Sequence, residues 1–163
     1  MPGPTLAGFQ QWAQQVMGVT STGSSAILPS ADPSWTWAFA SAVNLVDPTW
    51  CQVSPLSYTQ MVYNVAANNL LYWAQDPASA PYYKNSPDQG ELKFFAYWRD
   101  KWNLLGPISG VVSGANDQGS GSTLEVPDAL KNLTLEDLLL YKTPYGRAYL
   151  AYAQQQGSLW GVS

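Results

Sequence analysis

Few side chains in this sequence could perform chemistry. Histidine is absent, and cysteine occurs once, at Cys51. Without these residues the chain has no Ser–His or Cys–His pair, no imidazole metal ligand and no cysteine zinc site. Cys51 follows Trp50 in an apolar stretch, where a small buried hydrophobic side chain is the favoured interpretation.

Two carboxylate pairs remain as candidates for acid–base catalysis: Glu125 with Asp128, and Glu136 with Asp137. Both pairs lie where a helix is expected to begin, and the helix dipole favours acidic residues there. The glycine-rich segment 113–122 has no basic neighbour and no phosphate-binding Gly-Lys-Ser/Thr motif. The sequence therefore predicts a protein that is not an enzyme, without a cofactor or a metal.

The composition favours assembly with other chains. Charged residues make up 11% of the sequence, against about 25% in ordinary soluble domains. There are 10 tyrosines and 8 tryptophans, and large aromatic side chains are enriched in protein interfaces. An obligate homo-oligomer is therefore favoured, and a monomer with a large aromatic core is the alternative.

The charge pattern bears on nucleic acids and membranes. The net charge is −4, and the first basic residue is Lys84. Such a chain has no basic surface with which to grip nucleic acid, although DNA could slide past it. The N-terminus lacks the features of a secretion signal, and no apolar run approaches roughly 18 residues. We expect a soluble protein made in a cytoplasm, without membrane contact.

The element expected at the centre of the fold is a helix over residues 55–76. Its apolar residues recur at three- and four-residue steps around most of the circumference, which is typical of a buried helix. A narrow stripe of neutral amides interrupts them: Gln60, Asn64, Asn68 and Gln75. We expect these amides to face a neighbouring chain or a closely packed loop, with Gln60, Asn64 and Asn68 as candidate interface residues.

The other helices are marked by capping residues and prolines. The predicted starts are Thr5, with Gly18 as terminator, then Asp32-Pro33, Ser54-Pro55, the segment 86–91, and Thr143-Pro144. A short turn is expected at Trp50 and Cys51, and a short helix over 135–141 after a capping box from Thr134 to Asp137.

Two short strand-like segments, 108–112 and 124–126, flank the loop 113–122. They predict a projecting hairpin, with an unstructured loop as the alternative. The edges of such a hairpin could pair with a neighbouring subunit. Val111 and Val112 are therefore candidate interface residues.

Two further pairs of large side chains are candidates for contact with a partner. Tyr82 and Tyr83 lie in a proline-bounded connection, and Leu159 and Trp160 lie in the terminal tail. Packing against the core of the same chain is the alternative for both.

These elements predict a single mainly α domain over 1–163. It would be a bundle of about four to five helices with a small β-hairpin or extended loop and a C-terminal arm. The helical core would span 1–105, the projecting hairpin or loop 106–126, and the C-terminal helices and tail 127–163.

Several blocks carry a resemblance to a known family: TQMVYNVAANNLLYWAQD, ELKFFAYWRDKWNL, VVSGANDQGSGS and TPYGRAYLAYAQQQGSLWGVS. Together they resemble the head–tail adaptor (head-completion or connector) proteins of tailed bacteriophages. The resemblance implies a helical bundle with an extended loop and a terminal arm, assembled as a ring beneath the portal. It assigns no catalytic residue, because that family works through surfaces.

The resulting expectation is a structural virion protein, a neck-ring subunit that connects portal to tail and lines the DNA passage. Its partners would be copies of itself, the portal and tail or neck proteins, and DNA would pass without specific binding. The alternative is a small aromatic-rich module that binds a ligand or carbohydrate through its rings.

Overall fold

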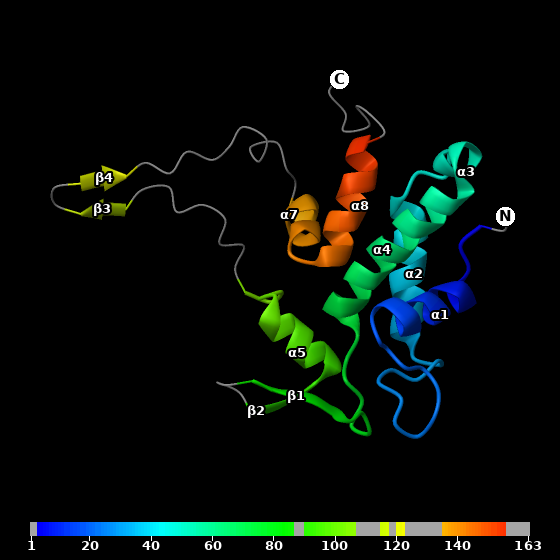
Figure 1. Cartoon of the computed structure of the whole chain (residues 1–163), viewed down its shortest axis with the longest axis horizontal. Coiled ribbons are helices and arrows are strands. Elements are labelled where there is room, and N and C mark those ends of the chain that lie inside the picture. The colour runs from blue at the N-terminus through cyan, green and yellow to red at the C-terminus, as the bar shows by residue number, and fades with distance from the viewer. Residues whose placement is uncertain (1–2, 87–89, 107–114, 118–119, 123–134, 156–163) are drawn as a thin grey trace.

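The computed structural model describes residues 3–86, 90–106, 115–117, 120–122 and 135–155. Within these residues the chain is mainly helical with small antiparallel sheets, which confirms the predicted fold class (Figure 1). The helices are α1 (Leu6–Val16), α2 (Pro33–Leu45), α3 (Trp50–Val53), α4 (Pro55–Trp73), α5 (Phe94–Lys101), α7 (Leu135–Tyr141) and α8 (Pro144–Gln155). The strands are β1 (Tyr82–Ser86), β2 (Gly90–Lys93), β3 (Ala115–Asp117) and β4 (Ser120–Ser122).

Local capping confirms the predicted helix starts at Thr5, Asp32 and Ser54. The side chain of Thr5 accepts from the Gly8 N–H at 3.0 Å, and that of Asp32 accepts from the Ser34 N–H at 2.8 Å. The side chain of Ser54 caps α4 in the same way. Each cap satisfies a backbone donor that has no partner inside its own helix. Helix α1 ends before Gly18, whose φ of 78° is a conformation that glycine adopts readily.

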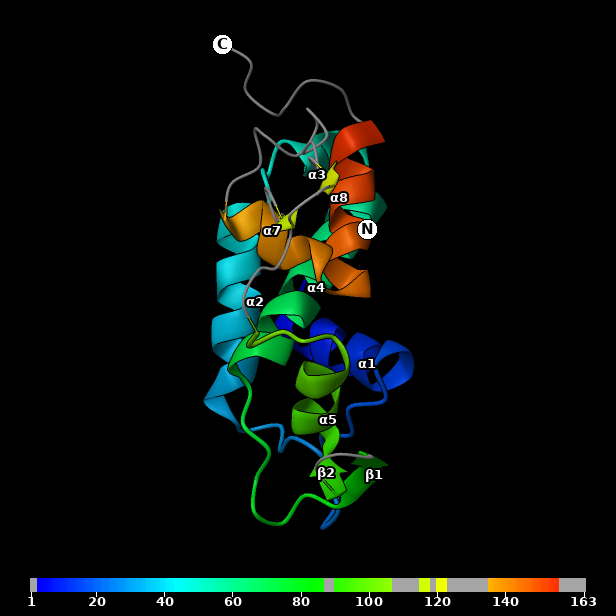
Figure 2. The same ribbon diagram turned by 90° about the vertical axis from the view of Figure 1, so that its left-hand side faces the viewer.

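Helix α4 is the centre of the fold, as its pattern predicts. Eleven of its 19 residues are buried. Helices α2 and α8 make the most extensive contacts with it and lie on either side of it (Figures 1 and 2). By its spacing Leu56 belongs to the apolar residues of the predicted central helix, but it lies in the first turn of α4 and is 57% exposed. None of the described helices is both long and apolar enough to cross a lipid bilayer.

The aromatic side chains form one continuous set of ring contacts, which we call the ring network. It links α1, α2, α4, α5, α8 and β1 with centroid separations between 4.5 and 6.5 Å. Its members are Phe9, Trp12, Trp35, Phe39, Tyr63, Tyr83, Phe94, Phe95, Tyr97, Trp98, Trp102 and Tyr145. Much of the aromatic content therefore packs inside this chain, where each ring buries a large apolar area.

The segment between α4 and α5 corrects a prediction. A helix was expected to start at 86–91, but strands β1 and β2 pair antiparallel there, with Tyr82 opposite Lys93 and Ser86 opposite Gly90. Gly90 has a φ of 74°, which interrupts any helix at that point. Helix α5 consequently begins only at Phe94.

Helices α4 and α5 cap each other, and we call this arrangement the α4–α5 joint. The two carboxylate oxygens of Asp76 accept from the Phe95 and Ala96 N–H groups at 2.9 and 2.8 Å. The Arg99 guanidinium donates to the Leu71 carbonyl at 2.7 Å and also to the carbonyls of Tyr72 and Ala74. The N-terminal donors of α5 and the C-terminal acceptors of α4 are thus satisfied by charged groups of the matching sign.

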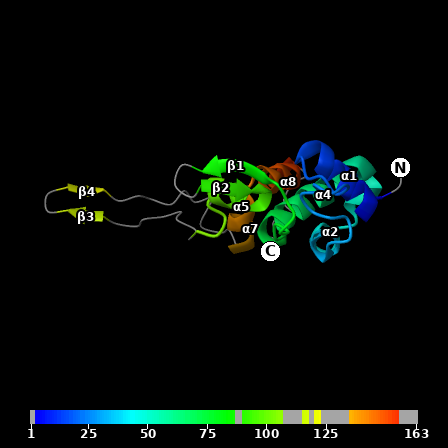
Figure 3. The same ribbon diagram turned by 90° about the horizontal axis from the view of Figure 1, so that it is seen from below.

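The second sheet lies within the segment predicted to be a loop. Strands β3 and β4 pair antiparallel, with Ala115 opposite Ser122 and Asp117 opposite Ser120. Only two residues separate the strands, the shortest connection typical of a hairpin. Figures 1 and 3 show the pair apart from the helices. The strands predicted at 108–112 and 124–126 lie outside the described residues.

Candidate functional site

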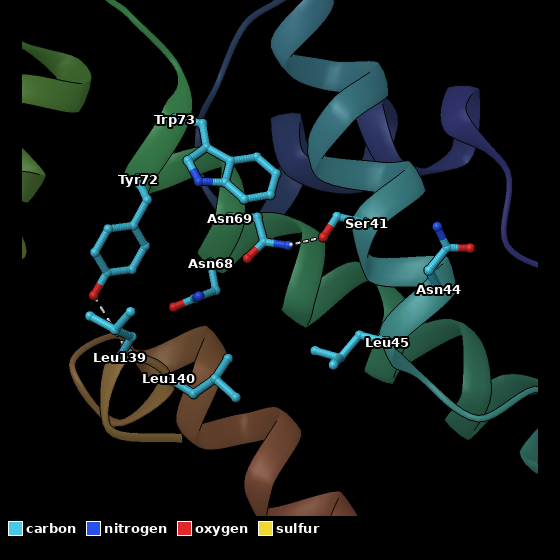
Figure 4. A pocket seen from close by; sticks show the side chains of 9 residues that line it. All are labelled: Ser41, Asn44, Leu45, Asn68, Asn69, Tyr72, Trp73, Leu139 and Leu140. Carbon is cyan, nitrogen blue, oxygen red and sulfur yellow. Dashed lines mark hydrogen bonds between the residues drawn. The ribbon is translucent and has the colours of Figure 1, made fainter. Parts of the chain in front are cut away.

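A pocket of about 590 Å³ opens between α2, α4 and α7 (Figure 4). We call it the α2–α4–α7 pocket. Its lining side chains are Ser41, Asn44, Leu45, Asn68, Asn69, Tyr72, Trp73, Leu139 and Leu140. They supply three amides, one aliphatic hydroxyl and two aromatic rings, and none carries a charge at neutral pH. The volume is in the range of small-ligand sites.

Helical spacing brings the polar lining residues together. On α2, Ser41 and Asn44 are three residues apart and share one face. On α4, Asn69 and Trp73 are four residues apart and share another. The Asn69 side-chain amide donates to the Ser41 hydroxyl at 3.5 Å, which joins the two faces at the pocket wall (Figure 4).

Helix α7 closes the pocket from the other side. The Tyr72 hydroxyl donates to the Leu139 carbonyl at 3.2 Å, and Leu139 and Leu140 supply the apolar wall. Burial raises the pKa of Tyr72 above its ordinary value of 10.0, so this hydroxyl stays a donor at neutral pH.

Thr143 connects the pocket floor to α8. Its hydroxyl donates to the Asn68 side-chain oxygen at 2.7 Å and accepts from the Gly146 N–H at 2.9 Å. Thr143 is fully buried and Asn68 is 3% exposed. The prediction that Thr143 caps the last helix is confirmed, and the same hydroxyl also fixes a pocket residue.

Thr143→Val should lower the free energy of unfolding by about 2 kcal/mol. The substitution keeps the volume of the side chain but removes the α8 cap and leaves the Asn68 oxygen without its partner. Urea denaturation followed by circular dichroism measures the loss. Thr143→Ser keeps the hydroxyl and serves as the control. Equal losses for the two variants would contradict this role.

Alkaline pH should destabilise the fold, because three partly buried tyrosines ionise less readily in the folded chain than in the unfolded chain. Burial raises the pKa of Tyr72, Tyr145 and Tyr149 above 10.0. Unfolded tyrosines therefore ionise first, so stability is complete below about pH 10 and declines as the pH rises through the folded-state values. Urea midpoints measured from about pH 8 to about pH 11 test this, and Tyr149→Phe should flatten the decline. A flat wild-type profile would contradict it.

The structure gives two of the three predicted interface amides, those of Asn64 and Asn68, partners inside this chain. The Asn64 side-chain amide donates to the main-chain carbonyl of Gln60 at 2.8 Å, one turn earlier on α4. Asn64 is 7% exposed, and Asn68 bonds to Thr143. Neither side chain is open to another chain here, because α4 is surrounded by the other helices. Gln60 is half-buried.

The predicted tyrosine pair divides between two environments. The ring of Tyr83 lies 5.0 Å from that of Phe94 and 5.3 Å from that of Tyr97, so it belongs to the ring network. Tyr82 is 64% exposed. The remaining candidates, Val111, Val112, Leu159 and Trp160, lie outside the described residues.

Among the predicted site residues that the structure describes, only Asn68 lines the pocket. Sequence reasoning missed Ser41, Asn44, Asn69 and Trp73. The available signal was the pair of short polar stripes on the predicted second and central helices. No local pattern indicates that these stripes meet, because the meeting depends on how α2 packs against α4.

Of the candidate catalytic groups, the structure describes the side chains of Cys51 and Asp137. Across those residues no three His, Cys, Asp or Glu side chains are placed to hold a metal ion. Cys51 is half-buried on α3. Asp137 is buried, while the side chains of Glu125, Asp128 and Glu136 lie outside the described set.

Comparison of the chain with protein-family models, with curated proteins and with solved structures finds no match. Function is therefore inferred from the residues and their geometry. The pocket offers neutral hydrogen-bonding groups and rings, which suit recognition of an uncharged surface or ligand.

Proposed function

We propose that this chain is a structural virion protein of a tailed phage, a head–tail adaptor that forms a ring between portal and tail. The supporting observation is the number of large apolar side chains that are exposed among the described residues. They are Val16, Trp37, Leu45, Val53, Leu56, Trp73, Tyr82, Tyr83 and Leu105. Scattered exposed hydrophobic residues are ordinary, but grouped ones mark sites of interaction.

Several of these side chains are grouped. Leu45 and Trp73 border the α2–α4–α7 pocket, and Trp37 lies one turn before Ser41 on the same face of α2. Val53 and Leu56 lie three residues apart at the corner between α3 and α4. A ring subunit contacts neighbours on more than one side, which suits several separate apolar groups.

Several cationic side chains bind main-chain carbonyls of this chain, which supports the passage of DNA without retention. The Lys93 ammonium donates to the Pro77 and Ala78 carbonyls at 2.8 and 2.9 Å. The Lys142 ammonium donates to the Asn103 and Gly106 carbonyls, each at 2.9 Å. Arg99 is engaged in the α4–α5 joint. These three cations are engaged inside the chain, and a net charge of −4 does not favour the retention of phosphates.

The molar mass of the purified protein, alone and with a portal ring, tests this proposal. Light scattering or native mass spectrometry should find a defined ring or a stoichiometric complex with the portal. A protein that stays monomeric at all concentrations and leaves the portal unbound would contradict the proposal.

A second candidate function follows from the pocket itself. Three amides beside Tyr72 and Trp73 suit a neutral, hydroxyl-rich ligand such as a saccharide, because the rings stack on the sugar face and the amides bind its hydroxyls. Titration with a panel of saccharides, with Asn69→Ala and Trp73→Ala as pocket variants, tests it. Saturable binding that both variants abolish would favour this function over assembly.

A further inference from the structure

Two described lysines differ from the others in their surroundings. Lys93, Lys142 and Arg99 bind main-chain carbonyls, and Lys93 also lies 6.0 Å from the ring centroid of Tyr82. Lys84 and Lys101 instead lie over the same ring, with their ammonium nitrogens 5.6 and 5.7 Å from the centroid of Tyr97. Both lysines are exposed.

These lysines and their rings form one surface. Lys101 also lies 4.6 Å from the Trp98 ring centroid, and Lys84 lies 6.0 Å from that of Tyr83. The rings hold the ammonium groups in place through cation–π attraction. Two like charges that converge on one ring repel each other, so an anion placed between them would be bound favourably. We call Tyr83, Lys84, Tyr97, Trp98 and Lys101 the base–aromatic face.

A complementary surface lies at the corner where α2 passes into α3. Asp47 is exposed, and bonds from Thr49 hold the pKa of its carboxyl below the ordinary value of 3.8. Beside it is a small pocket of about 220 Å³. The pocket is lined by Leu45, Val46, Asp47, Trp50, Met61, Tyr149 and Ala153.

This corner joins apolar surface to a single negative charge. Val53 lies one turn after Trp50 and is 71% exposed, and Leu56 follows at the start of α4. A small pocket lined by apolar side chains and one carboxylate suits an aromatic side chain that has a cation next to it. We call Asp47, Trp50, Val53 and Leu56 the acid–apolar corner.

The two surfaces lie at opposite ends of the helical body. Figures 1 and 2 both show α3 at one end and the β1–β2 pair at the other. A contact between such surfaces is heterologous, because each copy uses a different surface toward each neighbour. Repetition of that contact produces a closed ring or an open filament.

We infer that the base–aromatic face of one copy binds the acid–apolar corner of the next. The inference rests on the proposed function, since it names the surfaces through which the ring closes. The occupant is a second copy of this chain because one molecule carries both complementary surfaces, and each matches the other in charge and in exposed apolar side chains.

Charge reversal tests the contact. Asp47→Lys gives a chain with two basic ends, and the double variant Lys84→Glu with Lys101→Glu gives a chain with two acidic ends. Each variant alone should need at least roughly tenfold more protein to assemble, because like charges then meet at the contact. An equimolar mixture should assemble like wild type, with the two variants alternating in the native mass spectrum.

The controls separate folding and net charge from the contact. Arg147→Glu reverses an exposed cation on α8 that belongs to neither surface and should assemble like wild type. Circular dichroism of every variant reports whether the fold is kept. A chain that carries all three reversals should also assemble, because its complementarity is restored with the signs exchanged.

Three other outcomes would contradict the inference. If both reversed variants assemble like wild type, the ring proposal stands but this contact is wrong. If the double lysine variant assembles normally and loses only weak retention of DNA, the base–aromatic face serves phosphates instead. If wild type never assembles and ignores the portal, the proposed function fails together with the contact.

Discussion

Arg99→Ala should lower the free energy of unfolding by about 3–4 kcal/mol. The guanidinium donates to three carbonyls at the end of α4, from Leu71, Tyr72 and Ala74. Without it these acceptors remain in a partly buried position with no donor, and the Asp76 carboxylate at the start of α5 loses its positive neighbour. Burial lowers the pKa of Arg99 and the Asp76 charge opposes this, yet an arginine stays charged throughout the physiological range.

Matched variants show whether the α4–α5 joint is the cause. Arg147→Ala removes one exposed bond, to the Tyr141 carbonyl, and should cost below about 1 kcal/mol. Asp76→Ala removes the α5 cap and should cost about 1–2 kcal/mol. A double-mutant cycle between Asp76 and Arg99, measured by urea denaturation, should give a coupling energy above about 0.5 kcal/mol. Equal losses for Arg99→Ala and Arg147→Ala would refute the joint.

Gly146→Ala should destabilise the fold by about 3 kcal/mol. A β-carbon at this position would overlap the main-chain carbonyl of Leu140, which cannot move without displacing α7. Helix propensity alone predicts the opposite sign, a gain of about 1 kcal/mol for alanine inside a helix. The sign of the measured change in unfolding free energy therefore decides between the two effects.

Displacement of α7 by Gly146→Ala should also disturb the α2–α4–α7 pocket. Leu139 and Leu140 line it, and the Tyr72 hydroxyl holds α7 through the Leu139 carbonyl.

Gly8→Ala in α1 is the control, because its β-carbon would meet the far end of the Tyr63 side chain rather than a main-chain atom. A smaller loss is expected there. A Gly146→Ala protein as stable as wild type would contradict the close contact of α7 with α8.

The helix starts were predictable because the signal and the structure it produces lie within a few residues. Thr5, Asp32 and Ser54 each accept a bond from a backbone N–H two or three residues later. The proline that follows Asp32 or Ser54 fits the first turn of the helix. Such local chemistry can be recognised from sequence alone.

The α4–α5 region was not predictable for the opposite reason. Asp76 was interpreted as the end of the central helix, but its carboxylate caps a helix that begins at Phe94. The start of α5 therefore carries no capping residue of its own, and Lys93 makes no side-chain cap. The interpretation of 86–91 as a helix start failed because the true cap lies far away in the sequence.

Predicting the pocket from the sequence would likewise have required knowledge of contacts between distant residues. Asn68 was selected for its neutral amide, but its partner Thr143 is 75 residues away. Ser41 and Asn69 were not selected, since each is an ordinary polar residue on its own helix. Only the packing of α2 and α7 against α4 turns these residues into one site.

The ring network will also affect the ultraviolet and fluorescence spectra of this protein. Trp98 and Trp102 have ring centroids 4.5 Å apart and ring planes inclined at 31°, so their electronic transitions couple and add an exciton band to the far-ultraviolet spectrum. Excitation will migrate among the neighbouring rings before emission. Fluorescence will therefore report the state of the whole set, and replacing one tryptophan will change the quantum yield of the others.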